Sequence, residues 1–319
     1  MSVTGPHDNA AYTYTRDGQL ASRVDASGTT SFGYDTAGRV RTVANPTTGV
    51  TLGVEYNQLS QPNKVTYGGS NVRTFGYDPL HRVQTDTIKT ADGAVTLGSI
   101  TYGYDANGNE TAKTTTGVAG ASANTYTYDL ADRLTAWTAG STTTAYAYDA
   151  AGNRTQAGAK AFTYDDRNQL LTQSGGTSYS YTPRGTLRHT TTPTGGHATS
   201  ADAFGQVTSQ AAAGGTSEYA YDALGRALRP GFMYSGTANT LAADTTATYT
   251  RGPGGEVIGT GPGTGAGSVY VWSDQHTDIV GQFTGAGRLL TGSATYDPLG
   301  RLLRTDMPDF RPGDTVKVH

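Results

Sequence analysis

Hydrophobic and polar residues alternate along this chain in short runs, and aromatic residues recur two positions apart. In segments 32–34, 75–77, 102–104, 126–128, 146–148, 162–164 and 219–221, an aromatic residue and a tyrosine flank a glycine, threonine or alanine. Residues two apart share one face of a β-strand, so both rings of each pair lie on the same face. No stretch has the 3.6-residue apolar spacing of an amphipathic helix. The pattern therefore predicts short strands along the whole chain.

A tight turn is predicted directly after the second aromatic residue of each segment. In the copy at Tyr34, Asp35 opens the turn, and Gly38 and Arg39 lead into the returning strand. An aspartate carboxylate accepts hydrogen bonds from backbone N–H groups further along a turn. Glycine at the fourth position after the tyrosine suits the positive φ of a bulge. Each unit therefore reads as strand, turn and strand.

Copies of this unit recur about every twenty residues. Where glycine is absent at the bulge, Asp132 and Asn168 also tolerate positive φ, whereas Ser60 and His81 fit less well. One hairpin is barely stable alone, so neighbouring hairpins must pair, and the phenol hydroxyls are expected to find Asp, Arg or Thr side chains as partners. The residues assigned to this structural motif are Tyr34, Asp35, Gly38, Arg39, Tyr77, Asp78, Tyr104, Asp105, Gly108, Tyr128, Asp129, Tyr148, Asp149, Gly152, Tyr164, Asp165, Tyr221, Asp222, Gly225, Arg226, Tyr296, Asp297 and Gly300.

Composition agrees with a folded all-β chain that has a thin apolar core. The 319 residues include 44 glycines and 21 tyrosines, and 35% of them are hydrophobic. Disordered chains are poor in aromatic residues, so the tyrosine content argues against disorder. We expect residues 1–302 to form one repeat segment, a long antiparallel sheet that spirals into a tube or a partial hollow shell. Residues 303–319 depart from the repeat and form a C-terminal tail.

Charge and motifs exclude several functional classes. The net charge is −3 without a basic stripe, so no nucleic-acid partner is expected. No run of about 18 apolar residues predicts a membrane span, and residues 1–7 do not resemble a signal peptide. The chain has no cysteine and no Gly-x-Ser-x-Gly elbow. The glycine-rich stretches 252–255 and 261–267 lack the Gly-Lys-Ser/Thr ending of a phosphate loop and are interpreted as flexible loops, so no cofactor is expected.

A few residues invite a chemical interpretation. The repeated aspartates offer many carboxylates, but their common turn position favours a structural role over catalysis. Segment 274–278 contains two aspartates and one histidine, which form a poor metal site without further ligands, and a structural polar cluster is favoured there. Trp137 and Trp272 are the better candidates for exposed aromatic residues that contact a ligand. Neither a catalytic residue nor a metal ligand is assigned.

The repeated Tyr-x-Tyr-Asp-x-x-Gly-Arg-Leu pattern resembles the YD repeat of bacterial Rhs and wall-associated proteins, of toxin-complex C subunits and of teneurins. The resemblance extends over roughly residues 12 to 302 and rests on about ten tandem copies. It implies a large β-cage, a ribbon of antiparallel strands around a hollow that holds a toxin in toxin members. The family's self-cleaving block ends in Asp-Pro-x-Gly-Leu. Segment 297–301 has Arg301 in the last place, so the resemblance does not extend to self-cleavage or to a toxin domain.

Two functional hypotheses follow. The first is a non-catalytic shell segment, secreted or at the cell surface, that encloses or presents a toxin cargo with the cargo or further shell segments as partners. The alternative is an adhesin or carbohydrate-binding scaffold whose aromatic residues contact cell-surface glycans. An enzyme is disfavoured because the sequence shows no catalytic constellation.

Overall fold

The computed structural model describes residues 2–5, 8–69, 71–118, 122–262, 267–284 and 289–305. The chain divides into two compact units. Unit 1 comprises Met1–Asn124 and Pro230–His319, and unit 2 comprises Thr125–Arg229. Strands and turns account for the described secondary structure, so the predicted all-β class of antiparallel hairpins is confirmed. Whether a boundary falls after residue 302 stays a prediction, because strand β30 runs to Thr305 and residues 306–319 lie outside the described part.

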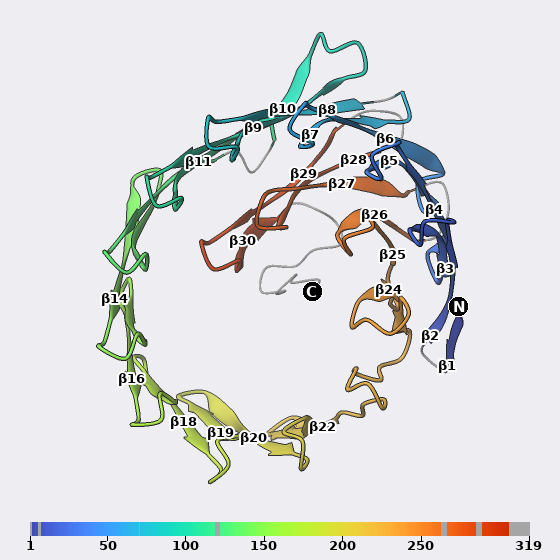
Figure 1. Cartoon of the computed structure of the whole chain (residues 1–319). Coiled ribbons are helices and arrows are strands. Elements are labelled where there is room, and N and C mark those ends of the chain that lie inside the picture. The colour runs from blue at the N-terminus through green and yellow to red at the C-terminus, as the bar shows by residue number, and fades with distance from the viewer. Residues whose placement is uncertain are drawn as a thin grey trace. The chain divides into compact units, whose positions relative to one another are not determined.

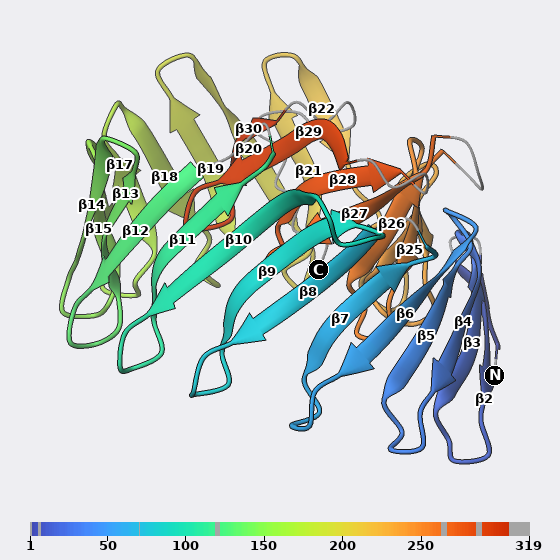
Figure 2. The ribbon, with the colours of Figure 1, turned by 90° about the horizontal axis from the view of Figure 1, so that it is seen from above.

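The first layer of unit 1 is a run of hairpins in which each strand pairs antiparallel with the next (Figures 1 and 2). Burial alternates along these strands, as in the Gly28–Tyr34 and Thr96–Tyr104 strands, because every second side chain faces the second layer. Figure 2 shows the turns that follow the even-numbered strands together at one end of the strands. The strands are β1 (Ser2–Gly5), β2 (Asp8–Tyr14), β3 (Leu20–Asp25), β4 (Gly28–Tyr34), β5 (Val40–Asn45), β6 (Val50–Tyr56), β7 (Pro62–Tyr67), β8 (Asn71–Tyr77), β9 (Val83–Thr90), β10 (Thr96–Tyr104) and β11 (Glu110–Thr116).

A β-bulge marks the end of the first strand of each hairpin. In the pairing of β4 with β5, the register shifts between Gly33 and Tyr34, and Tyr34 pairs with Val40. The same shift occurs at Tyr14, Tyr56, Tyr77 and Tyr104. The tyrosine of the repeat is thus the last paired residue before the turn, and the bulge increases the local twist of the hairpin.

A second layer of strands packs on the first within unit 1. Its consecutive strands pair antiparallel, and β2 meets β23 in a parallel contact at Asp8 and Tyr234. Strands β27 and β28 are buried on both faces, so burial does not alternate from one residue to the next along them. The strands are β23 (Met233–Tyr234), β24 (Leu241–Ala243), β25 (Thr248–Arg251), β26 (Val257–Gly261), β27 (Val269–Ser273), β28 (Ile279–Thr284), β29 (Leu289–Tyr296) and β30 (Leu302–Thr305).

The main hydrophobic core lies between these two layers. Ile88 and Ile100 of the first layer and Trp272 and Phe283 of the second are fully buried members of one cluster. Rings from the two layers also meet directly, since Tyr67 packs edge-on against Phe283 with 4.7 Å between ring centroids. Edge-to-face pairs of this kind are favourable beyond their area burial. The second layer therefore supplies the partners that bury the tyrosine-rich face of the first.

Unit 2 continues the same hairpins. Tyr146, at 8% exposed, is the only buried hydrophobic residue among the described residues of Thr125–Arg229. Its strands pair antiparallel in succession from β13 to β22. Strand β12 (Ser122–Tyr128) crosses the boundary between the units, and the others are β13 (Leu134–Ala139), β14 (Thr142–Tyr148), β15 (Arg154–Ala157), β16 (Lys160–Tyr164), β17 (Leu170–Gln173), β18 (Thr177–Tyr181), β19 (Leu187–Thr192), β20 (Gly195–Ala201), β21 (Val207–Ala212) and β22 (Gly215–Glu218).

Candidate functional site

The repeat turn, exemplified by residues 35–39, is a five-residue turn whose first side chain binds its own backbone. Asp35 Oδ1 accepts hydrogen bonds from the backbone N–H groups of Ala37 and Arg39, both at 2.9 Å. Asp35 Oδ2 accepts a third from Arg39 Nε at 2.8 Å. The backbone N–H of Asp35 donates to the Arg39 carbonyl at 2.9 Å, and that of Gly38 donates to the Asp35 carbonyl at 3.0 Å. The Arg39 hydrogen bonds hold the pKa of the Asp35 carboxyl below its usual value, so the turn is organised around a carboxylate.

The fourth residue of the repeat turn always has a left-handed backbone. Gly38 has φ of 79°, and Ser60 and His81 have φ of 62° and 66° although both carry a Cβ atom. Ser60 and His81, which are expected to fit this position less well, adopt the conformation nonetheless, because the hydrogen bonds of the turn impose it. The same two backbone hydrogen bonds close the turns at 15–19, 57–61, 78–82, 105–109, 129–133, 149–153, 165–169, 182–186, 202–206, 222–226, 252–256, 274–278 and 297–301.

Nine of the described hairpins are attached to the preceding one by the tyrosine before the turn. The Tyr34 hydroxyl donates to the Leu20 carbonyl at 2.7 Å, and the Tyr104 hydroxyl donates to the Val83 carbonyl at 2.7 Å. The expectation of side-chain partners for these hydroxyls was thus wrong, because the first carbonyl of the previous returning strand lies within reach. The same contact is made by Tyr56, Tyr77, Tyr148, Tyr164, Tyr181, Tyr221 and Tyr296.

Arginine at the fifth position of the turn extends toward the next hairpin. The Arg39 guanidinium lies 4.5 Å from the centroid of the Tyr56 ring, and that of Arg82 lies 4.4 Å from the Tyr104 ring. A guanidinium over an aromatic face is attracted by the ring quadrupole. The Tyr, Asp and Arg residues of the motif therefore join neighbouring hairpins as well as closing their own turn.

Two repeat turns escape recognition from the sequence. Segment 252–256 was interpreted as a flexible loop, yet Gly252 N–H donates to the Glu256 carbonyl at 2.8 Å, and Gly255 has φ of 89°. Segment 274–278 is a second such turn, with Thr277 at φ of 66° in the bulge position. The signal that could have found the first is the three-residue spacing of Gly252 and Gly255 before a β-branched strand start.

The turn at 252–256 differs from the turn at 35–39 at its first and last residues. Glycine replaces the aspartate at position 252, and Glu256 replaces the arginine. The Glu256 carboxylate accepts hydrogen bonds from the backbone N–H groups of Gly254 and of Glu256 itself, the same two positions that Asp35 serves in its own turn. A Cβ atom at Gly252 would collide with this carboxylate. Glu256 therefore takes over the function of the missing aspartate from the far end of the turn.

The turn at 274–278 is held by residues of the first layer. Asp274 Oδ2 pairs with Lys113 Nζ, and Gln275 Nε2 donates to the Tyr104 hydroxyl at 2.6 Å. His276 Nε2 lies 3.3 Å from Glu110 Oε2, and this hydrogen bond raises the pKa of His276. Position 278 is an aspartate, whereas the turn at 35–39 has Arg39 in that place. Lys113 of β11 therefore supplies the cation that pairs with Asp274.

The structure places the two tryptophans differently. Trp272 is 0% exposed and its indole Nε1 donates to Asp86 Oδ2 at 3.0 Å, so the expectation that its ring is available to a ligand was wrong. The same carboxylate accepts from Arg73 NH2 at 2.6 Å, and Arg73 NH2 also donates to the Ser273 carbonyl at 2.7 Å. Trp137 is half-buried on β13 in unit 2.

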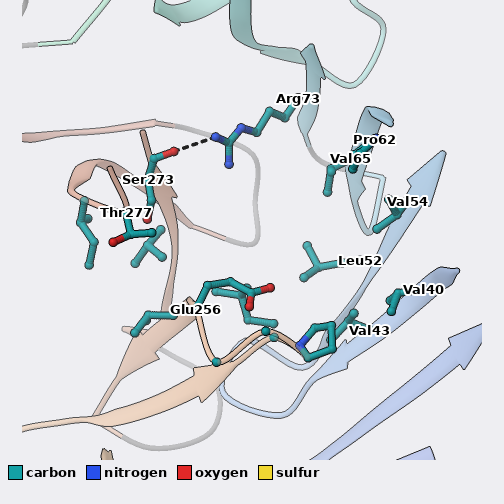
Figure 3. A pocket seen from close by; sticks show the side chains of 18 of the residues that line it. Val40, Val43, Leu52, Val54, Pro62, Val65, Arg73, Glu256, Ser273 and Thr277 are labelled. Carbon is teal, nitrogen blue, oxygen red and sulfur yellow. Dashed lines mark hydrogen bonds between the residues drawn. The ribbon is translucent and has the colours of Figure 1, made fainter. Parts of the chain in front are cut away.

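A cavity of about 760 Å³ lies within unit 1 (Figure 3). One wall consists of aliphatic side chains of β5 to β7, among them Val43, Leu52 and Val65. The repeat turns at 252–256 and 274–278 form the other side. Figure 3 shows the Glu256 side chain directed into the space toward the aliphatic wall. Burial raises the pKa of the Glu256 carboxyl.

The described residues contain no group of three or more His, Asp or Glu side chains placed to hold a metal ion. Over the same part of the chain, the structure has no helix long and apolar enough to span a membrane.

Comparison with known proteins gives two family matches. Residues 72–229 match the teneurin YD-shell family, and residues 14–51 match the RHS repeat family. No curated protein is similar to the chain at a significant level.

Solved structures with a similar fold include TcdB2-TccC3 without its hypervariable C-terminal region, at a TM-score of 0.61 and 15% identity over 92% of this chain. The TcdB2-TccC3-Cdc42 structure gives a TM-score of 0.59 and 15% identity over 91% of this chain. This chain covers 18% of the length of each of those chains. At such identities the likeness concerns the fold.

Proposed function

The chain belongs to the Rhs and YD-repeat family, and on that premise we propose that it is a non-catalytic segment of a shell that encloses a polypeptide toxin. The observation that carries the proposal is the attachment of nine hairpins to the preceding one through a tyrosine hydroxyl and a backbone carbonyl. Contacts that repeat between neighbours stabilise an extended wall rather than a compact site. The tyrosines of the motif therefore have a structural role, since their hydroxyls bind neighbouring hairpins.

The similar structures support this assignment in one further way. The TM-score is 0.59 for the TcdB2-TccC3-Cdc42 structure and 0.61 for the structure without the hypervariable C-terminal region. The likeness is thus nearly the same in the structure that lacks the hypervariable C-terminal region, so the shared fold is present without that region. A fold that persists without that region suits a shell segment.

The length of the chain bears on its partners. Because it covers 18% of the similar chains, we propose that further shell segments complete the enclosure, and that the assembly acts outside the cell that makes it. Detection of the protein in cell-free culture supernatant that lacks a cytoplasmic marker enzyme would support this location. Finding the protein there only when the cytoplasmic enzyme is also released would contradict it.

Protease protection tests enclosure. The chain is purified with the polypeptides encoded beside it, and each candidate cargo is digested with and without the chain. We expect one cargo to become resistant to proteolysis in the presence of the chain and to regain sensitivity when the chain carries Trp272→Ala, which removes a buried ring between the layers of unit 1. Equal digestion with and without the chain would contradict enclosure. Glycan binding that is lost in Trp137→Ala would instead favour the adhesin.

A further inference from the structure

We infer that the cavity of unit 1 binds an apolar polypeptide segment that carries a lysine or arginine, and that Glu256 receives the cation. The inference rests on the proposed function and names the chemistry of the enclosed polypeptide at one site. It follows from the aliphatic wall, from the position of Glu256 and from the pairing of Arg73, Asp274 and His276, which also line the cavity.

The wall opposite Glu256 is suited to hydrocarbon. Val40, Val43, Leu52, Val54 and Val65 line it, and the Glu256 side chain points toward it from the turn (Figure 3). A cavity of about 760 Å³ lies within the roughly 300–1,000 Å³ typical of ligand pockets. Burying an aliphatic side chain against this wall gains about 25 cal/mol per Å² of apolar area removed from water.

Three other charged residues that line the cavity already have partners. Arg73 is paired with Asp86 at 2.6 Å, and Asp274 is paired with Lys113. His276 lies 3.3 Å from Glu110. Within the described part of the chain, Arg251 has no carboxylate partner, but its guanidinium donates to the carbonyls of Leu241 and Gly255, and it does not line the cavity. Among the described residues Glu256 takes part in no ion pair, and its two hydrogen bonds come from neutral backbone N–H groups.

A carboxylate in this position favours a cationic ligand. Burial disfavours its charged form and raises the pKa of Glu256, although the charges of Arg23 and Arg251 act in the opposite direction. A lysine ammonium or an arginine guanidinium brought in by a bound segment would form a charge-assisted hydrogen bond, which is stronger than a neutral one. An apolar segment without a cation would leave the carboxylate desolvated and unpaired.

Peptide titration tests the inference. The probes are acetyl-Leu-Lys-Leu-amide and the matched acetyl-Leu-norleucine-Leu-amide, measured by isothermal titration calorimetry at pH 7 with the whole chain. We expect the lysine peptide to bind at least tenfold more tightly than the norleucine peptide, and Glu256→Gln to remove that difference. Glu55→Gln is the control, because Glu55 lies on β6 beside lining residues but pairs with Lys64 at 2.9 Å outside the cavity. Affinity for the lysine peptide should fall as the pH is lowered through the raised pKa of Glu256.

Three outcomes would overturn the inference. Equal binding of the two peptides would remove the role of charge, and an equal loss in Glu55→Gln would remove the role of the site. Binding of n-octylamine as tight as that of the lysine peptide would mean that the cavity takes a free amine rather than a polypeptide. The outcome is separable from the proposed function, since cargo protection by the Glu256→Gln chain would persist if enclosure is right and this site is wrong.

Discussion

Units 1 and 2 share the same repeat turn but differ in what covers their strands. In unit 1 the second layer buries Ile88 and Ile100 completely, whereas in unit 2 the described strands leave side chains such as Leu171 at 37% exposed. The turn hydrogen bonds are the same in both, as Asp35 and Asp129 show. The difference teaches that the repeat motif fixes local hairpin geometry, whereas burial depends on a second layer that the motif does not encode.

The largest effect is expected from removing the ring that joins the layers. Trp272→Ala leaves a cavity beside Ile88 and Ile100, and should lower the free energy of unfolding of unit 1 by about 3–5 kcal/mol. Hydrogen exchange followed by mass spectrometry reports the loss in β8 to β10 separately from unit 2. The control is Trp137→Ala, since Trp137 is only half-buried. Equal losses in the two variants would refute the distinction between the units.

Loss of a turn aspartate should destabilise the protein more in the second layer of unit 1 than in unit 2. Asp274→Ala leaves the Lys113 ammonium buried without its partner, and should lower the free energy of unfolding of unit 1 by about 3–5 kcal/mol. Asp129→Ala removes the equivalent carboxylate from an exposed turn and leaves Arg133 free to reach water, so a smaller loss is expected. Urea denaturation of both variants, with the wild-type chain alongside, measures the difference. A larger loss in Asp129→Ala would contradict it.

A close approach between layers gives a somewhat smaller effect. A Cβ atom at Gly98 would lie 2.6 Å from Cζ3 of Trp272, so Gly98→Ala should destabilise unit 1 by about 1–3 kcal/mol. Leucine at position 272 removes the ring, so Gly98→Ala should cost less stability in the Trp272→Leu chain than in the wild-type chain, which a double-mutant cycle measures. Gly214→Ala is the matched control in unit 2, where a Cβ atom meets nothing within 4 Å. Persistence of the full loss in the Trp272→Leu background would show that the indole is not the obstacle.

The smallest effect concerns pH. The hydrogen bond to Glu110 raises the folded pKa of His276 above its usual 6.5, with Asp274 adding to the rise and Lys113 opposing it. This contribution to stability is therefore fully present below pH 6.5 and is lost as the pH rises through the folded value. Because the His276 side chain is 62% exposed, the change should be small. The expected result is a slightly lower protection factor in segment 274–278 at pH 8 than at pH 6, once the intrinsic exchange rate at each pH has been divided out, and no such difference in His276→Gln.

The hairpins of the first layer could be predicted from the sequence because the residues that form each turn are close together in the chain. Tyr34, Asp35 and Gly38 lie within five residues and make their turn contacts with one another or with the adjacent hairpin. The second layer could not be predicted in this way, since Lys113 and Asp274 are 161 residues apart and nothing in either neighbourhood specifies the other. The turn at 252–256 was missed because Glu256 performs the aspartate's task from the opposite end of the turn. Trp272 was misjudged because alternation does not report burial on both faces of a strand.

The tyrosine-to-carbonyl bond gives the ribbon a direction. Tyr34 uses a carbonyl of the hairpin made before it, and no tyrosine of this set uses a carbonyl of the hairpin made after it. Each of these hairpins therefore finds its acceptor carbonyl already present when the chain is synthesised from the N-terminus, where domains generally fold first. Growth in the opposite sense would present each tyrosine before its acceptor exists. The run of hairpins is therefore expected to assemble in the order in which the chain is translated.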